Sequence, residues 1–200
     1  MTNLLQINSS IYNGSGQSTR LADRFVEAFR RRHPDALIVK RELARDPVPH
    51  LTAERFGAFQ RKPEERSAAE NDVVAFSDVL IDELRRADVI VLGLPMYNFG
   101  VPSQLKAYFD HIARAGITFR YTTNGPEGLL KGKKAYVFAA RGGVFAGSSL
   151  DTQTGYVRDF LRFLGIEHIE FVHAEGLALG EPSRSQSLSE AGAAAERLAA

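Results

Sequence analysis

Residues 89–94, with the sequence Val-Ile-Val-Leu-Gly-Leu, constrain the fold of this chain more than any other stretch. The run is apolar without interruption and rich in β-branched side chains, which is typical of a strand covered by helices on both faces. A strand of this kind lies at the centre of a parallel sheet. The run therefore predicts an α/β fold in which strands and helices alternate along the chain.

A loop of unusual composition follows this strand. Tyr97, Asn98 and Phe99 stand between Pro95 and Pro102, and Pro102 is expected to be the first residue of a helix. Open α/β sheets bind ligands at the carboxyl ends of their strands, which is where this loop lies. Two aromatic faces and an amide suit a flat heterocycle with an imide edge. An ordinary turn whose aromatic side chains pack into the core would contain the same residues.

A second candidate binding loop follows the first expected strand, residues 4–8. Residues 9–18 are rich in serine and glycine, and an amphipathic helix begins at once, with Ser18 as its expected N-cap and His33 near its end. Backbone amides at a helix N-terminus bind anions, and neighbouring hydroxyl groups add donors. We therefore expect a phosphate here, although serine and glycine also cluster in turns that bind nothing.

Three well-known phosphate sites differ from this loop. Gln17 stands where a Walker loop has lysine. Residues 14–19 lack the third glycine of a dinucleotide-binding fingerprint. Asn8 ends the strand where a phospho-acceptor domain would have a carboxylate. With these three sites set aside, the remaining interpretation is a hydroxyl-lined loop that binds a terminal phosphate monoester.

Further helix signals lie between residues 43 and 87. Thr52 is the expected N-cap of a short helix that ends at Phe59, and residues 67–70 form a capping box that opens a long helix. The expected core-facing residues of the long helix are Ala69, Val73, Phe76, Leu80 and Leu84.

The rest of the chain continues the alternation of strands and helices. Further strands are expected at residues 36–39, 134–140 and 168–172, which gives five in all. Helices are expected after Pro102, before a C-capping Gly165, and at residues 187–198. Residues 116–128 are expected to be a turn-rich crossing that contains the aromatic residues Phe119 and Tyr121.

Composition limits the chemistry and the partners of the chain. The 25 Lys and Arg residues nearly balance the 24 Asp and Glu residues, so no broad basic surface for nucleic acid is expected. The absence of cysteine excludes disulfides, thiolate metal sites and a cysteine nucleophile. The five histidines have no metal-binding spacing, so we expect no metal site, and redox chemistry would need a bound cofactor.

Targeting and membrane signals are not apparent in the sequence. The first residues have neither a basic region nor a long apolar stretch, and no run of about 18 apolar residues occurs. We expect a soluble, cytoplasmic protein with no membrane partner. Its 200 residues are expected to form a single domain, residues 1–200.

These motifs together resemble those of the bacterial FMN-dependent NAD(P)H azoreductases and quinone reductases, which are flavodoxin-like proteins. The resemblance runs from end to end and is carried by Ser9, Ser10, Gln17, Ser18 and residues 95–99, 108–110, 113–116, 118–121, 124–128 and 141–143. The combination of residues 96–99 with residues 124–128 is specific to this family. The resemblance implies a doubly wound, five-stranded parallel sheet of order 2-1-3-4-5, with helices on both faces.

The resemblance also implies an FMN site. The residues expected to hold the phosphate are Ser10, Gly16, Gln17 and Ser18. The residues expected to surround the isoalloxazine ring are Met96, Tyr97, Asn98, Phe99, Ala140, Arg141, Gly142 and Gly143. Relatives carry serine where this chain has Ala140, so only a backbone hydrogen bond is expected there. Tyr121 and Phe99 are expected near the substrate slot, although a packed loop aromatic would look the same.

The activity implied by the resemblance is a ping-pong hydride transfer. NADH or NADPH would reduce FMN, and FMN would reduce quinones or azo compounds, with cleavage of the azo bond to aromatic amines. A homodimer with each flavin near the subunit interface is implied as well. No acid–base pair is expected, because a flavin carries its own redox chemistry.

Two other functions compete with this interpretation. One is an electron-carrier flavodoxin, although carriers are typically strongly acidic and this chain has a formal charge of +1. The other is a ligand-binding α/β domain without a flavin. The sequence leaves the physiological acceptor and the choice between NADH and NADPH open.

Overall fold

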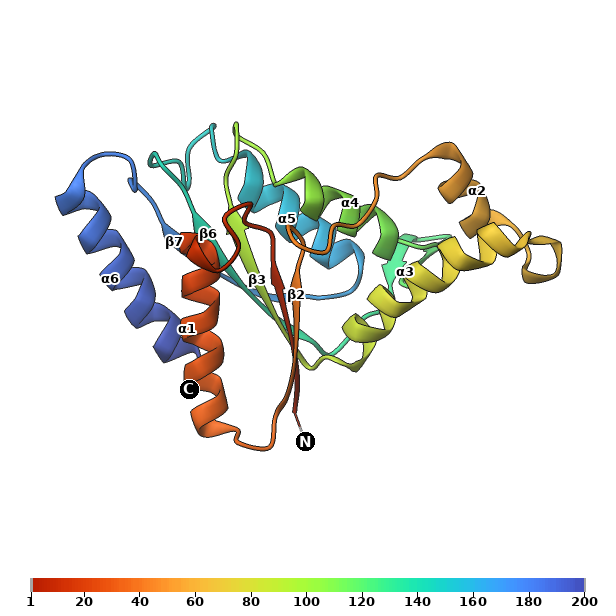
Figure 1. Ribbon diagram of the computed structural model, residues 1–200, viewed down its shortest axis with the longest axis horizontal. Helices are drawn as coiled ribbons and strands as arrows, with labels where there is room; N and C mark the ends of the chain where they lie inside the picture. The colour runs from red at the N-terminus through yellow and green to blue at the C-terminus, as the bar shows by residue number, and fades with distance from the viewer. Residues whose placement is uncertain (1, 200) are drawn as a thin grey trace.

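The computed structural model describes residues 2–199. The expected central strand is β3 (Val89–Pro95), and it is buried along its whole length. Five parallel strands form one sheet of order β2-β1-β3-β6-β7 (Figure 1). The other four are β1 (Asn3–Asn8), β2 (Leu37–Glu42), β6 (Lys134–Ala140) and β7 (His168–Ala174). The five strands thus follow the expected order 2-1-3-4-5 once β4 and β5, which lie outside this sheet, are left out of the numbering.

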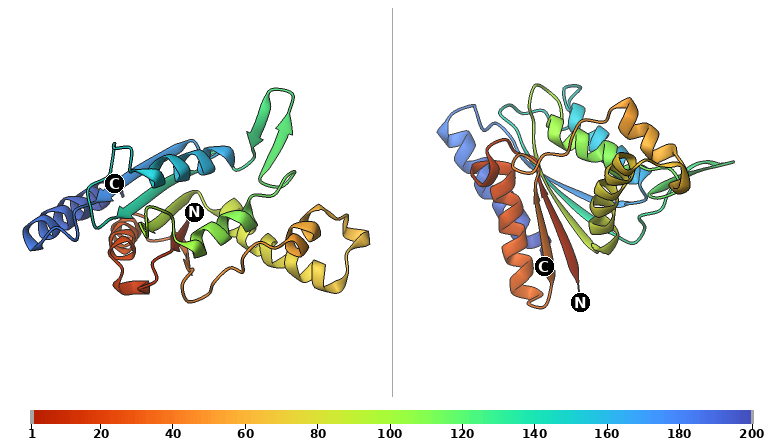
Figure 2. Two further views of the ribbon diagram at one scale, coloured as in Figure 1. Left: turned by 90° about the horizontal axis from the view of Figure 1, so that it is seen from above. Right: turned by 45° about the vertical axis from the view of Figure 1, so that its right-hand side comes forward.

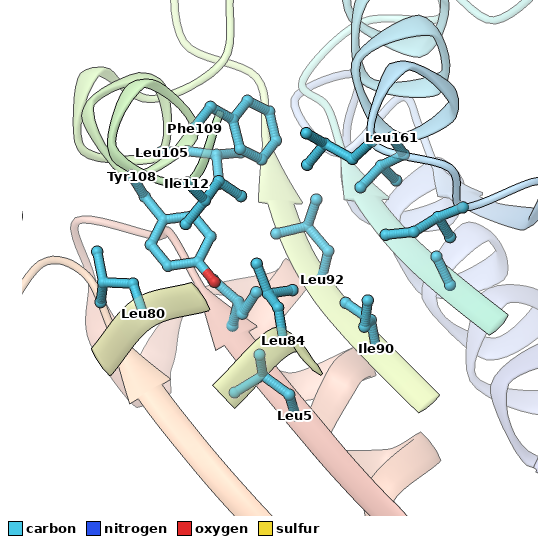
Figure 3. Packing of buried hydrophobic residues seen from close by; sticks show 14 of the residues in the cluster. Leu5, Leu80, Leu84, Ile90, Leu92, Leu105, Tyr108, Phe109, Ile112 and Leu161 are labelled. Atoms are coloured by element: carbon cyan, nitrogen blue, oxygen red, sulfur yellow. The ribbon is translucent and has the colours of Figure 1, made fainter. Parts of the chain in front are cut away.

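Helices cover both faces of the sheet. On one face lie α1 (Gln17–Arg32) and α6 (Glu181–Leu198), and on the other lie α3 (Ala68–Arg86), α4 (Ser103–Ile112) and α5 (Thr152–Phe163). Alternate residues of β3 point to opposite faces. Val89 and Val91 pack with residues of α1 and α6, whereas Ile90, Leu92 and Leu94 pack with residues of α3, α4 and α5 (Figure 3).

The segment between β2 and β3 forms an extension beside the sheet. It contains α2 (Ala53–Gln60), which Thr52 caps, and the expected capping box of α3 is present. The buried residues of α3 are Val74, Ser77, Leu80, Ile81 and Leu84. The expected core-facing residues Leu80 and Leu84 are thus confirmed, whereas those expected in the first half of the helix are wrong. The beginning of α3 extends past the sheet and packs with α2 instead (Figure 2), which leaves Phe76 37% exposed.

The expected turn-rich crossing contains an antiparallel hairpin of β4 (Phe119–Thr122) and β5 (Gly125–Gly128). The hairpin stands out from the body of the molecule (Figure 2). Its base packs against the turn after α5: a Cβ atom on Gly128 would lie 2.0 Å from the backbone nitrogen of Gly165. Glycine is therefore needed where these two backbones meet.

Several helix ends differ from the expected ones. Pro102 precedes α4 as its N-cap and is not its first residue. Leu164 is the C-cap of α5, and Gly165 follows it with a φ of 98°. The last helix begins at Glu181, before the expected residue 187. The sequence did not predict this earlier start because the first turns of the helix are polar and largely exposed and have little apolar periodicity.

Within residues 2–199, no helix has both the length and the apolar character needed to cross a bilayer. The same residues contain no cluster of three or more His, Cys, Asp or Glu side chains that could hold a metal ion.

Candidate functional site

The loops after β1, β3 and β6 meet at the carboxyl edge of the sheet, which is the upper edge in Figure 1. They enclose an open pocket of about 420 Å³. The expected site residues that line it are Ser10, Gly16, Gln17, Met96, Tyr97, Ala140, Arg141 and Gly142. A neighbouring hollow includes Asn98 and shares Met96 and Tyr97 with the pocket. The structure thus brings together residues that are more than a hundred positions apart in the sequence.

The first loop leaves the N-terminus of α1 without a side-chain cap. The N-cap is Gly16 and not the expected Ser18, and the first turn contains no acidic residue. A Cβ atom on Gly16 would lie 2.2 Å from Ser10 Oγ, so the loop can close only around a glycine. Amides at this end, together with the positive end of the helix dipole, suit an anion.

Ser18 lies in the first turn of α1 and is fully buried. Its hydroxyl has no hydrogen-bond partner among residues 2–199. An unpaired buried hydroxyl costs roughly 1–3 kcal/mol, and an oxygen atom that accepts its hydrogen would remove this cost. The residues at this end of the site therefore fit a phosphate group. Ser9 has a structural task instead, because its hydroxyl donates to the carbonyl of Gly93 at 2.8 Å.

The loop after β3 contains a tight turn with an unusual backbone. Tyr97 and Gly100 exchange two backbone hydrogen bonds, of 3.2 and 3.0 Å, around Asn98 and Phe99. Asn98 has a φ of 49° and Phe99 a φ of 61°, as in a type I′ turn. A left-handed conformation is uncommon for a bulky residue and costs about 1–3 kcal/mol. Its surroundings must therefore hold this turn in place.

Tyr97 joins the two loops. Its hydroxyl lies 3.4 Å from Ser10 Oγ and accepts a hydrogen bond of 3.3 Å from the backbone amide of Ile11. The loop expected to bind a ring and the loop expected to bind a phosphate are thus parts of one hydrogen-bonded unit.

The loop after β6 supplies backbone to the site. The carbonyl of Ala140 accepts a hydrogen bond of 3.0 Å from the amide of Met96, so the lack of a side-chain hydroxyl at residue 140 does not prevent this contact. Gly143 leaves space for a neighbour, because a Cβ atom there would lie 2.6 Å from the ring of Phe145. Gly142 is less constrained, because a Cβ atom there would lie 3.4 Å from the Cβ atom of Ala178.

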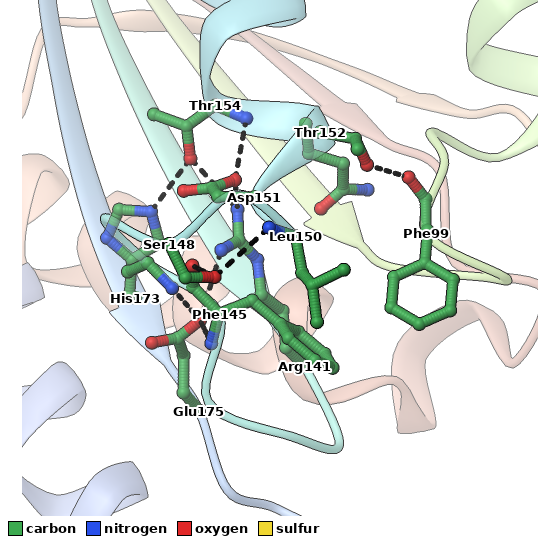
Figure 4. Close-up of polar contacts among 12 residues, drawn as sticks. Phe99, Arg141, Phe145, Ser148, Leu150, Asp151, Thr152, Thr154, His173 and Glu175 are labelled. Atoms are coloured by element: carbon green, nitrogen blue, oxygen red, sulfur yellow. Dashed lines mark hydrogen bonds and ion pairs between the residues drawn. The ribbon is translucent and has the colours of Figure 1, made fainter.

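The side chain of Arg141 is bound within the protein through its two terminal nitrogen atoms, whereas Nε has no partner among residues 2–199 (Figure 4). Its guanidinium group is buried and donates to Asp151 at 2.8 Å, Glu175 at 3.0 Å and Thr154 at 2.9 Å. Glu175 also accepts hydrogen bonds of 2.9 Å from the amides of Phe145 and Ala146. Arg141 therefore fixes the loop after β6, and its two terminal nitrogen atoms are already occupied within the protein.

Two pKa shifts follow from this buried network. Burial alone would raise the pKa of Asp151, but hydrogen bonds from Arg141 and Thr154 and the charge of Arg141 lower it to about 2. Burial, and then the positive charge of Arg141, lower the pKa of His173. The network therefore contains one firmly ionised carboxylate next to a neutral imidazole at neutral pH.

Five lining residues were not predicted as site residues from the sequence: Tyr12, Pro95, Leu177, Ala178 and Arg184. Arg184 comes from the first turn of α6, and within residues 2–199 no carboxylate lies within ion-pair distance of it. Its Nη1 atom makes one long hydrogen bond, of 3.5 Å, to the carbonyl of Leu177. The only sequence cue was that the last strand ends at the same edge of the sheet.

Exposed apolar side chains surround the mouth of the site. Phe99 is 51% exposed and packs edge to face against Phe145. Others near the same loops are Ile11, Tyr12, Val144, Leu150 and Leu179. Tyr121 lies on the hairpin, is 75% exposed and lines neither the pocket nor the neighbouring hollow. Its expected place near a substrate therefore stays a prediction that would need a second chain.

The sequence model of the protein family described as having a flavodoxin-like fold matches residues 2–199. Similar sequences include an FMN-dependent NADH:quinone oxidoreductase of Burkholderia pseudomallei (strain 1710b), which is 54% identical over 191 residues and 96% of each chain. Another protein of that name, from Cellvibrio japonicus, is 50% identical over 185 residues, which cover 92% of this chain and 93% of the relative.

Similar solved structures include two azoreductases. The structure of an FMN-dependent NADH-azoreductase from Bacillus anthracis in complex with FMN is 29% identical, with a TM-score of 0.88 and complete coverage of both chains. An azoreductase from Bacillus anthracis is 26% identical, with a TM-score of 0.92, and the match covers 100% of this chain and 99% of that one.

Proposed function

This chain belongs to the family with the flavodoxin-like fold, and from that premise we propose that it is an FMN-dependent NADH:quinone oxidoreductase that also reduces azo compounds. The names of relatives that are half identical over nearly the whole chain support this proposal. The observation that carries it is local: an uncapped helix N-terminus with an unpaired buried hydroxyl and a strained aromatic turn line one edge of the sheet.

The residues divide between the two ends of the cofactor. We assign the phosphate to Ser10, Gly16, Gln17 and Ser18, since these contribute the amides and hydroxyl groups that a phosphate monoester needs. We assign the ring to residues 96–99 and 140–143, where apolar and aromatic groups meet backbone donors. Arg184 adds a positive charge beside the pocket and is a further candidate to bind an anionic group of the cofactor or substrate.

Bound FMN would supply the redox chemistry, accepting a hydride from NADH and passing two electrons to the second substrate. The protein itself would bind, orient and exclude water. The open apolar rim around Phe99 suits flat aromatic substrates such as quinones and azo compounds. Donor and acceptor would use this rim in turn, as a ping-pong mechanism requires.

A homodimer would complete the site. The pocket is open on the side where the exposed apolar residues gather, and a hydride donor must be held within about 3–3.5 Å of its acceptor. A second chain related by twofold symmetry would provide the missing wall. We also propose a cytoplasmic location, as expected from the sequence.

Two measurements test the proposal. Mass spectrometry of the cofactor released from purified protein should find FMN and not FAD, since the first loop suits a terminal phosphate. Steady-state turnover with NADH should be observed with both a quinone and an azo dye, and NADPH serves as the comparison. FMN binding without turnover of either substrate would favour an electron carrier. No flavin after reconstitution would favour a ligand-binding domain of another kind.

A further inference from the structure

The strained turn after β3 is held from behind by the first turn of α5. Gln153 is fully buried there, and its Nε2 atom donates to the carbonyl of Pro95 at 2.8 Å and to the carbonyl of Gly100 at 2.9 Å. Its neighbour Thr152 donates from Oγ1 to the carbonyl of Phe99 (Figure 4). Three carbonyls of one short loop thus bind to two successive side chains of α5.

The orientation of the Gln153 amide is determined by its partners. Both partners are carbonyl oxygens, which only accept, so the NH₂ group must face them. The Oε1 atom is then buried without a partner among residues 2–199. An apolar side chain of similar volume would avoid this unsatisfied oxygen, so packing alone does not explain a glutamine here.

We propose that Gln153 is a positioning residue for the flavin ring. It lines neither the pocket nor the neighbouring hollow, and it acts by fixing both ends of the turn that carries Asn98 and Phe99. The two donated hydrogen bonds hold the left-handed backbone of these residues, so that the ring meets a preformed surface. This role rests on the proposed function, because it requires that the turn contacts a flavin.

The first test replaces the donors and keeps the volume. Gln153→Met should weaken FMN binding about tenfold, as expected for the loss of two buried hydrogen bonds that preorganise the site. Riboflavin should be weakened by the same factor, because the turn serves the ring and not the phosphate. Fluorescence titration of the apoprotein measures both constants, and circular dichroism verifies the fold. Gln186→Met is the matched control, since that side-chain amide is exposed on α6 and, among residues 2–199, bonds only to Glu190.

A second variant gives a pH signature that a purely structural role would not produce. In Gln153→Glu, an ionised carboxylate would face two carbonyl oxygens and displace the turn. When the new carboxyl group takes up a proton, it can donate one hydrogen bond. The flavin affinity of Gln153→Glu should therefore rise as the pH falls, whereas the affinity of Gln153→Met should keep a constant ratio to that of the unmutated protein.

The coupling between Gln153 and the turn decides the matter. If Gln153 acts through the turn, the loss of affinity in a Gln153→Met, Asn98→Ala double variant should be smaller than the product of the two single losses. Unchanged affinity in Gln153→Met, or losses that simply multiply, would overturn the positioning role. Failure of the unmutated protein to bind FMN would instead overturn the proposed function and this role with it.

Discussion

Gly16 shows how a single missing side chain can shape a candidate binding site. Its place against Ser10 leaves no room for a Cβ atom, and the helix that follows has no side-chain cap. The sequence predicts a phosphate at this loop, which stays a prediction, and Ser18 as the helix cap, which is wrong because Gly16 is the N-cap. Serine is a common capping residue, and only the packing of the loop shows that no side chain within residues 2–199 caps these amides.

Gly16→Ala should weaken FMN binding by more than tenfold, because the new methyl group would displace Ser10 and reopen the loop. Riboflavin, which lacks the phosphate, should lose much less affinity. Gly14→Ala is the control, since its Cβ atom would meet nothing within 4 Å. Equal losses for FMN and riboflavin in Gly16→Ala would mean that the first loop does not bind the phosphate.

Asp151 should make the stability of the protein depend on acid pH. Its pKa is about 2 in the folded protein against an ordinary value of 3.8, so the folded state holds the proton less tightly than the unfolded state. The stabilisation is fully present above about pH 4 and is lost as the pH falls toward 2. Asp151→Asn should lower the free energy of unfolding at pH 7 by about 1–3 kcal/mol.

Urea titrations of both proteins between pH 2 and pH 7 measure this effect. The difference between Asp151→Asn and the unmutated protein should shrink below pH 4. A difference that stays constant over the whole range would show that the carboxylate is not the group that titrates.

At the scale of secondary structure, the sequence predicted all five strands of the sheet because each contains several apolar residues within a short stretch. Residues 134–140 were even placed with their observed ends. The hairpin of β4 and β5 was missed, since three of the four residues of β4 are exposed and the strand carries no clear alternation. The face of α3 was misjudged for a related reason, because periodicity cannot tell where the sheet beneath a helix ends.

The base of the hairpin offers a test of element packing. Gly128→Ala should lower the free energy of unfolding by roughly 1–3 kcal/mol, because its methyl group would collide with backbone atoms of Gly165 and Leu164 that have little freedom to move. Gly155→Ala in α5 is the control, since it meets open space and should be neutral or stabilising by about 0.5–1 kcal/mol. Equal stability of Gly128→Ala and the unmutated protein would contradict this close packing.

At the scale of the whole molecule, the open pocket and the exposed aromatic residues belong to one problem. A flavin held at this edge of the sheet would be covered on one side by the loops described above and left open toward Phe99. Tyr121 is the most exposed of the large apolar side chains, yet within its own chain it lines neither hollow at the site. A single sequence cannot place a residue relative to a second chain, so this part of the site could not be derived from it.

The proposed dimer predicts that two inactive variants restore each other. At an FMN concentration that saturates only the unmutated loop, Gly16→Ala should be largely free of FMN and inactive, and Tyr121→Ala should bind FMN but lose quinone turnover. In a mixed dimer, one site would combine an intact first loop with an intact tyrosine from the partner, and the other site would lack both. Random exchange makes half of all dimers mixed, so an equimolar mixture should regain about one quarter of the unmutated activity. Subunit exchange is verified by native mass spectrometry of the same sample. If the subunits exchange and no activity returns, each site is built within one chain, and the wall contributed by the partner must be given up.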